Sequence, residues 1–166
     1  FGNSYWGALA GYASENVRIS DITVTDSTLT GYSKLPQVNS NTLAIGGIIG
    51  HGCADISNCT VSDTVSLTGY ASKFSTYIHL GGIAGQTDSF TDNTFSGETD
   101  IAVTNCVFSG TITASDSDGY PALVRSGGIT GYANIPISNC INSGTINIDT
   151  CDSGTVVGGI VGYGDS

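Results

Sequence analysis

Gly46-Gly47-Ile48-Ile49-Gly50 is one of five closely related glycine phrases in this chain of 166 residues. The others are Trp6-Gly7-Ala8-Leu9-Ala10-Gly11, Gly81-Gly82-Ile83-Ala84-Gly85, Gly127-Gly128-Ile129-Thr130-Gly131 and Gly158-Gly159-Ile160-Val161-Gly162. Their origin glycines lie 40, 35, 46 and 31 residues apart, at Gly7, Gly47, Gly82, Gly128 and Gly159. Such recurrence is typical of a solenoid, in which one structural unit stacks on copies of itself. The sequence therefore predicts a single domain, or a fragment of a longer solenoid, with repeat units near 7–46, 47–81, 82–127, 128–158 and 159–166.

A second phrase follows each of the first four glycine phrases and indicates a bend in the chain. Its copies are Ile19-Ser20-Asp21-Ile22, Ile56-Ser57-Asn58-Cys59, Val103-Thr104-Asn105-Cys106 and Ile137-Ser138-Asn139-Cys140. Ile and Cys are three positions apart, so a flat strand would direct them to opposite faces. Both point inward if the chain bends between them, and Asn tolerates the left-handed backbone conformation of such a bend. We expect a corner ladder of Asn58, Asn105 and Asn139, and one buried apolar slot filled by Cys59, Cys106 and Cys140.

A third β-prone segment lies six residues beyond each Cys, at Val65, Ile112 and Ile146. Since no helical periodicity is present, each unit is predicted to contain three short strands separated by Gly, Asn, Asp and Ser. Stacked units place strand on strand at about 4.8 Å, with Ile, Val and Cys inside and Ser and Thr outside. The expected fold is therefore all-β: a parallel β-helix of four to five coils. Its right-handed sense is expected from the usual crossover between parallel strands.

The net charge of −10, with four Lys and Arg in total, excludes several functional classes. Such a surface lacks the basic footprint of a nucleic-acid-binding protein and would be repelled by an anionic membrane. The apolar stretches are too short to insert into a membrane. The chain does not begin with Met, shows no signal peptide, and begins and ends near a glycine phrase. We expect a piece of a longer solenoid, whose ends are covered by further coils of the same protein or by neighbouring copies end to end.

The five cysteines are not expected to form a reactive or metal-binding site. In-register side chains on parallel strands have poor geometry for disulfide bonds, so the three ladder thiols are predicted to be buried and reduced. Cys53 and Cys151 lie outside the ladder and could each be free or paired. There is no Cys-x-x-Cys string and no cluster with His51 or His79, so zinc is not predicted.

Two acidic segments offer weak calcium candidates. Asp88 and Asp92 belong to the inserted loop 86–100, and Asp116 and Asp118 precede a glycine in a second loop. Carboxylates at such spacing hold calcium in some loops, but the distant bidentate Glu of an EF-type loop is missing. A solvated acidic loop is the simpler interpretation. No other cofactor and no catalytic residue is predicted.

Aromatic and hydroxyl side chains suggest two kinds of surface. Tyr12, Tyr132 and Tyr163 directly follow a glycine phrase, and His51 and Gln86 occupy the same place in other units. A column of rings at this edge is either a structural ladder or a surface that stacks on sugars or packs on a partner. A threonine array for ice binding is not predicted, because Thr does not recur at a fixed paired spacing.

The string Gly-Gly-Ile-Val-Gly-Tyr at 158–163, together with Ile-Ser-Asn-Cys at 137–140, resembles the GLUG repeat. This repeat occurs in large secreted or wall-anchored bacterial proteins, including IgA1-type metalloproteases and adhesin-like proteins of gut bacteria. The first unit departs from the pattern, with Trp6 for the leading Gly and Ile22 for Cys. The resemblance implies a secreted or cell-surface β-helical segment. It transfers no catalytic residue, because the His-Glu-x-x-His string of the metalloproteases is absent from this chain.

Two functional classes follow. The first is a non-catalytic structural or adhesive module of a bacterial extracellular protein: a rigid spacer, a filament unit, or a surface for a host protein or glycan. Its binding surface is expected on the inserted loops 86–100 and 113–125, since insertions project from a stacked body. The alternative is a β-helical polysaccharide lyase or hydrolase. A lyase needs a basic residue and a cation to neutralise the uronate, which four Lys and Arg make difficult.

Overall fold

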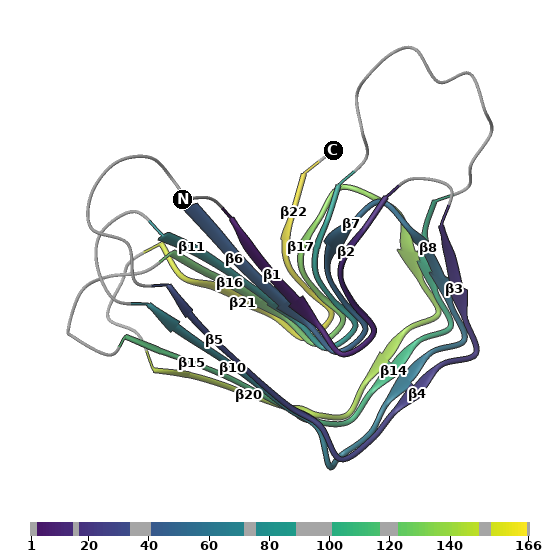
Figure 1. The fold of residues 1–166 in the computed structure, drawn as a ribbon, viewed down its shortest axis with the longest axis horizontal. Coiled ribbons are helices and arrows are strands. Elements are labelled where there is room, and N and C mark those ends of the chain that lie inside the picture. Colours follow the sequence, from purple (N-terminus) through teal and green to yellow (C-terminus); the bar gives the residue numbers. More distant parts are fainter. Residues whose placement is uncertain are drawn as a thin grey trace.

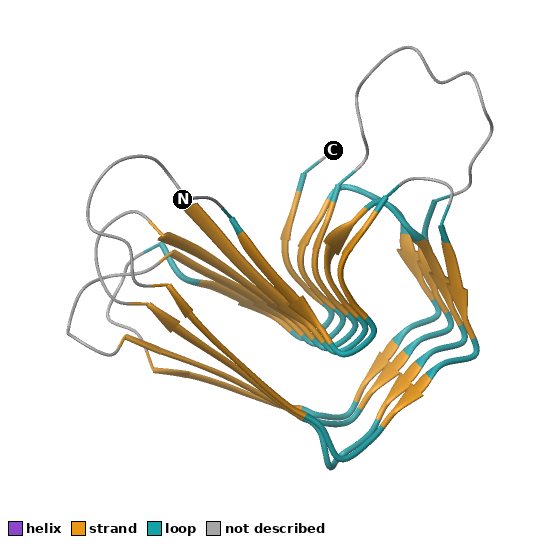
Figure 2. Cartoon of the chain, viewed as in Figure 1, coloured by secondary structure: helices purple, strands orange, loops and turns teal. Residues whose placement is uncertain are grey.

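The computed structural model describes residues 3–14, 17–33, 41–71, 76–88, 101–116, 123–149 and 154–165. These residues form 22 strands in five parallel sheets, with one strand of each sheet in every complete coil (Figures 1 and 2). The expected parallel β-helix is confirmed, with four complete coils followed by two strands of a fifth. Among the described residues, no helix is long and apolar enough to cross a membrane.

The sheets are named here in the order in which the chain visits them. Sheet A contains β1 (Ser4–Gly7), β6 (Asn41–Gly46), β11 (Thr76–Gly81), β16 (Leu123–Gly127) and β21 (Val156–Gly158). Sheet B contains β2 (Ala10–Ala13), β7 (Ile49–Gly52), β12 (Ala84–Thr87), β17 (Thr130–Ala133) and β22 (Val161–Gly164). Sheet C contains β3 (Arg18–Ser20), β8 (Asp55–Ser57), β13 (Val103–Thr104) and β18 (Ile137–Ser138). Sheet D contains β4 (Thr23–Val24), β9 (Thr60–Val61), β14 (Val107–Phe108) and β19 (Ile141–Asn142). Sheet E contains β5 (Thr28–Ser33), β10 (Ser66–Ala71), β15 (Thr111–Asp116) and β20 (Thr145–Asp149).

Each coil therefore has five strands, and the expected number of three is wrong. The glycine phrase is a turn that separates a strand of sheet A from a strand of sheet B (Figure 1). The second phrase likewise contributes to two strands, because its Asn bends the chain between a strand of sheet C and a strand of sheet D. Asn58, Asn105 and Asn139 have positive φ angles of 54°, 54° and 53°, and Asp21 has one of 59°. The predicted corner ladder is confirmed, and the Asn105 side-chain amide donates a hydrogen bond to Asn58 at 3.3 Å.

The third segment is shifted in the second coil. Leu67, and not Val65, pairs with Ile112, which in turn pairs with Ile146. The shift arises because the second coil contains an additional turn, closed by a hydrogen bond of 3.2 Å from the Val65 amide to the Ser62 carbonyl. Val65 is still buried, but it precedes the strand.

The glycine phrases are required by close packing of backbone on backbone, and not by unusual φ angles. A Cβ at Gly85 would lie 2.5 Å from the Ile45 amide nitrogen of sheet A. In the turn, a Cβ at Gly47 or Gly82 would lie 2.2 Å from the carbonyl oxygen of the next origin glycine. A Cβ at Gly128 would lie 2.3 Å from the corresponding oxygen of Gly159. Since no side chain fits these distances, the middle coils require glycine at this turn. In the first coil Gly7 pairs with Gly46, so Ala8 occupies the position of Gly47, and the expected match of Gly7 with Gly47 is wrong by one residue.

The core is continuous through the middle coils and partly open at the last coil. Ile48, Ile83 and Ile129 have no exposed surface, whereas Ile160 at the same phrase position is 37% exposed. The cysteine slot shows the same trend: Cys59 and Cys106 are fully buried, but Cys140 is only partly buried. The prediction that Cys140 is buried is therefore wrong, because no described strand of sheet C or D lies beyond β18 and β19, which flank it.

Candidate functional site

Sheets A and B face each other with two rows of mostly aromatic and polar side chains, which we call the A–B rows. The sheet A row is Tyr5, Ala44, His79, Arg125 and Val156. The sheet B row is Tyr12, His51, Gln86, Tyr132 and Tyr163. The second row is the column expected from the sequence. The sequence did not indicate that a histidine and an arginine of sheet A lie against it.

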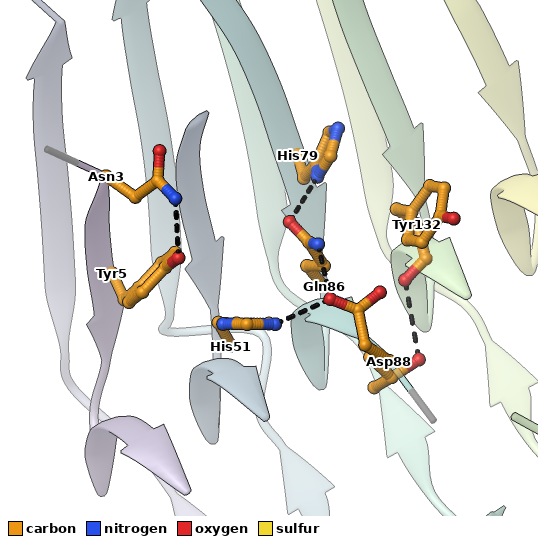
Figure 3. A network of polar contacts seen from close by, with 8 residues as sticks. Asn3, Tyr5, His51, His79, Gln86, Asp88 and Tyr132 are labelled. Carbon is orange, nitrogen blue, oxygen red and sulfur yellow. Dashed lines mark hydrogen bonds and ion pairs between the residues drawn. The ribbon is translucent and has the colours of Figure 1, made fainter. Parts of the chain in front are cut away.

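A chain of hydrogen bonds connects the middle coils of the two rows (Figure 3). His51 Nε2 lies 2.7 Å from Asp88 Oδ2, and the Gln86 amide donates to the same oxygen at 2.7 Å. His79 Nδ1 lies 2.9 Å from Gln86 Oε1. Because a carboxylate only accepts, the amide group of Gln86 faces Asp88 and its carbonyl oxygen faces His79. Neutral His79 therefore carries its proton on Nδ1, and its Nε2 has no partner among the described residues.

The charge states of this network follow from its burial. Burial lowers the pKa of His79 to about 4, further lowered by Arg125 and partly offset by the bond to Gln86. For Asp88, burial raises the pKa, but hydrogen bonds from His51 and Gln86 outweigh it, and the net pKa is lowered. At neutral pH, His79 is thus neutral and Asp88 is ionised. With 3% of its surface exposed, His79 is shielded from a substrate in solvent.

The rings of the last three coils stack on one another along the solenoid axis, whereas Tyr5, Tyr12 and His51 contact one another at tilted or edge-on angles. His79 and Tyr132 lie 5.4 Å apart with nearly parallel rings, and Tyr132 and Tyr163 lie 5.7 Å apart with an interplanar angle of 11°. The guanidinium of Arg125 lies 4.1 Å from the centre of the Tyr163 ring. Rings stacked in this way turn their faces toward each other, and sugars bind to ring faces. In the last three coils the geometry therefore favours the structural ladder over a glycan platform.

Of the four calcium candidates, only Asp88 has a side chain in the described part of the chain. Asp88 is engaged with His51 and Gln86. Asp116 ends β15, and its side chain is not described, while Asp92 and Asp118 lie outside the described residues. Among described residues, no group of three or more His, Cys, Asp or Glu side chains could hold a metal. Of the expected loops 86–100 and 113–125, residues 89–100 and 117–122 lie outside the described residues, and the flanks of the second belong to β15 and β16.

The thiols of the cysteine slot are held by backbone carbonyl groups. The Sγ atoms of Cys59, Cys106 and Cys140 donate to carbonyl oxygens two residues earlier, at 3.2–3.3 Å. Burial raises the pKa of Cys106 to about 12, so its reactive thiolate form is strongly disfavoured. Cys53 is a free thiol with 1% exposure, so it is shielded although it lies outside the slot. Cys151 lies outside the described residues.

Sheet E carries an ordered set of hydroxyl side chains that the sequence-based expectations do not include. Its first column is Thr28, Ser66, Thr111 and Thr145, and its second is Thr30, Thr68, Thr113 and Asn147. Counting from the cysteines aligns Val65 with Ile112, although the true partner of Ile112 is Leu67, two residues later. This misalignment concealed the pattern. An alignment on Leu29, Leu67 and Ile112 would have revealed it, because each of these residues stands between two hydroxyl residues.

Comparison with known proteins supports the repeat assignment. The family model of the GLUG motif matches residues 41–66, which run from β6 to the beginning of β10. The resemblance to GLUG-motif repeat proteins is thus confirmed over one coil. No curated protein and no solved structure matches the chain.

Proposed function

We propose that this chain of GLUG-type coils is a non-catalytic structural module, a rigid spacer in an extracellular or cell-surface protein. In this role its coils stack end to end with further coils. Adhesion to a host protein or glycan belongs to the same proposal, with inserted loops 86–100 and 113–125 as the binding surface. The bacterial origin and the secreted location are expectations that accompany the GLUG resemblance.

The exposed core of the last coil is the observation that carries the proposal. Val157 is 49% exposed, whereas Leu80, two coils earlier in the same row, is fully buried. Ile160 is likewise 37% exposed while Ile83 is fully buried. The first coil also exposes Trp6 and Leu9, by 48% and 51%. These apolar positions are ones that a neighbouring coil buries in the middle of the solenoid.

The shape of the C-terminal end specifies which strands would be added next. Sheets A and B end with β21 and β22 of the fifth coil, but sheets C, D and E end with β18, β19 and β20 of the fourth. A segment added after these strands would therefore pair with sheets C, D and E. Gly164 pairs with Ala133, so a copy of residues 136–149 appended after Ser166 keeps the repeat spacing.

This extension tests the stacking role directly. The added segment should cover Ile137, Ile146 and Ile148, which are partly exposed at present, and raise the melting temperature by about 5 °C. A control extension carries Asp at the two positions copied from Ile137 and Ile146, and should give no increase. If both extended chains melt at the same temperature, the end of the solenoid does not accept further coils and the proposal is wrong.

The alternative, a polysaccharide lyase or hydrolase, has less support. Asp88 already accepts two short hydrogen bonds, and His79 is buried with its pKa lowered to about 4, so neither is available to a polysaccharide at neutral pH. Assay of the chain on a panel of polysaccharides distinguishes the two functions. Turnover that disappears on changing a single Asp would replace the structural role by the enzymatic one.

A further inference from the structure

The outer face of sheet E carries a regular array of hydroxyl groups, which goes beyond the proposed spacer function. In β5, β10, β15 and β20, the inward positions hold Leu29, Leu67, Ile112 and Ile146, all of which contact the core. Side chains on both sides of these residues therefore point outward, because successive residues of a strand alternate. They are Thr28, Ser66, Thr111 and Thr145 in one column and Thr30, Thr68, Thr113 and Asn147 in the other.

The array is regular in two directions. The strands pair residue for residue over the whole array, without an inserted residue in any of the four. Neighbouring positions are thus about 4.8 Å apart along the solenoid axis and about 6.6 Å apart along each strand. All eight side chains are exposed or half-exposed. Six of them are threonine, whose β-branched side chain has few rotamers, so its hydroxyl and methyl groups hold fixed positions.

The array is also electrically neutral. None of its eight residues is charged, in a chain that has 14 acidic and 4 basic residues. Within the array a charged partner would find no complementary group, and Asp149 lies in the next outward column, at its end. A partner that presents a neutral lattice of hydrogen-bonding groups would match the array, because each hydroxyl both donates and accepts a hydrogen bond. Ice presents such a lattice, because every water molecule in it both donates and accepts hydrogen bonds.

We propose that the outer face of sheet E binds ice. The threonine hydroxyl groups would hydrogen-bond to water at lattice positions, and the threonine methyl groups would order the water between them. The rigid ladder holds the array in place before binding, so little conformational entropy is lost on contact with the crystal. A crystalline glycan is less favoured as occupant. The neighbouring Tyr32 and Tyr70 rings stack on each other with their centres 4.8 Å apart, so the two ring faces that touch are not accessible to a sugar.

The test is partition of the purified chain into growing ice, together with inhibition of ice recrystallisation. The array variant is Thr68→Lys, which places a long charged side chain within the array. The matched control is Thr104→Lys on sheet C, where Thr104 occupies an outward row with Ser57 and Ser138. Thr30→Lys is a second array variant in case Thr68→Lys melts below the control. The melting temperature of each variant is measured first.

Wild-type chain and Thr104→Lys are expected to enter the ice and inhibit recrystallisation, and both effects should be lost in the folded array variants. The proposal is overturned if wild-type chain is excluded from ice, or if the array and control variants lose ice binding equally. Binding of wild-type chain to cellulose or chitin, lost in Thr68→Lys, without any effect on ice would assign the face to a glycan instead. None of these outcomes depends on the added coils that test the spacer function.

Discussion

Replacing Gly82 by alanine tests the close backbone contact that defines each coil. A Cβ on Gly82 would lie 2.2 Å from the Gly128 carbonyl oxygen and 2.2 Å from Cγ of the fully buried Phe108. The oxygen belongs to the backbone of the next coil, and Cγ is the root of a packed ring, so neither can move independently. The substitution should therefore overpack the turn and destabilise the chain by about 3 kcal/mol.

Gly159→Ala is the matched control, because Gly159 has the same phrase position in the last coil. Its Cβ would meet nothing within 4 Å, and its φ angle suits any residue. Both substitutions restrict the unfolded chain equally, an effect of about 0.4–1 kcal/mol that cancels between them. The difference between the two variants therefore isolates the steric cost at Gly82.

The measurement is urea unfolding followed by circular dichroism, supported by thermal melting. Gly82→Ala should melt about 10 °C below Gly159→Ala, given the usual relation between stability and melting temperature for a chain of this size. If the unfolding free energy of both variants depends on urea with the same slope, the two variants have native and unfolded states of the same compactness and can be compared. Equal stability of the two variants would refute the argument, since it would mean that the coils do not approach each other as closely as the structure shows.

Three further predictions concern buried groups. Thr130 is fully buried and its hydroxyl has no hydrogen-bond partner among the described residues, so Thr130→Val should stabilise the chain by about 1 kcal/mol in urea unfolding. In native-state thiol labelling, Cys140 should react before Cys106, which is fully buried with a pKa raised to about 12; equal rates would contradict the cysteine slot. Acidification should lower the melting temperature: the pKa of His79 falls from 6.5 to about 4 on folding, so the unfolded chain binds the extra proton between these values. His79→Gln should flatten this pH dependence between pH 6.5 and 4, and an unchanged profile would show that His79 is not its source.

The corner ladder shows which features local sequence can specify. Asn58, Asn105 and Asn139 adopt left-handed φ angles as expected, because the preference belongs to the residue itself and recurs in each coil. The strand number could not be obtained in this way. The glycine phrase is rich in β-compatible residues, and its role as a turn depends on how near sheets A and B approach each other.

Register within sheet E was likewise decided by the fold. An additional turn before Ser66 moves the second coil by two residues, and a fixed count from each Cys cannot detect it. The A–B rows depend even more on tertiary structure, because His79 and Gln86 are brought together by the turn between their strands. His79 gave no signal of burial in the sequence, and its lowered pKa results from neighbours on two sheets.

The sequence by itself determined that this chain is a parallel solenoid with bends at Asn, because a repeated phrase and a local φ preference are encoded in short segments. Tertiary structure alone decided that five sheets form and that side chains of the two A–B rows contact one another. It also decided that the outer face of sheet E carries two unbroken columns of small polar side chains. Those features depend on distances between residues of different coils. Such distances are set when the backbones pack, and no single repeat contains them.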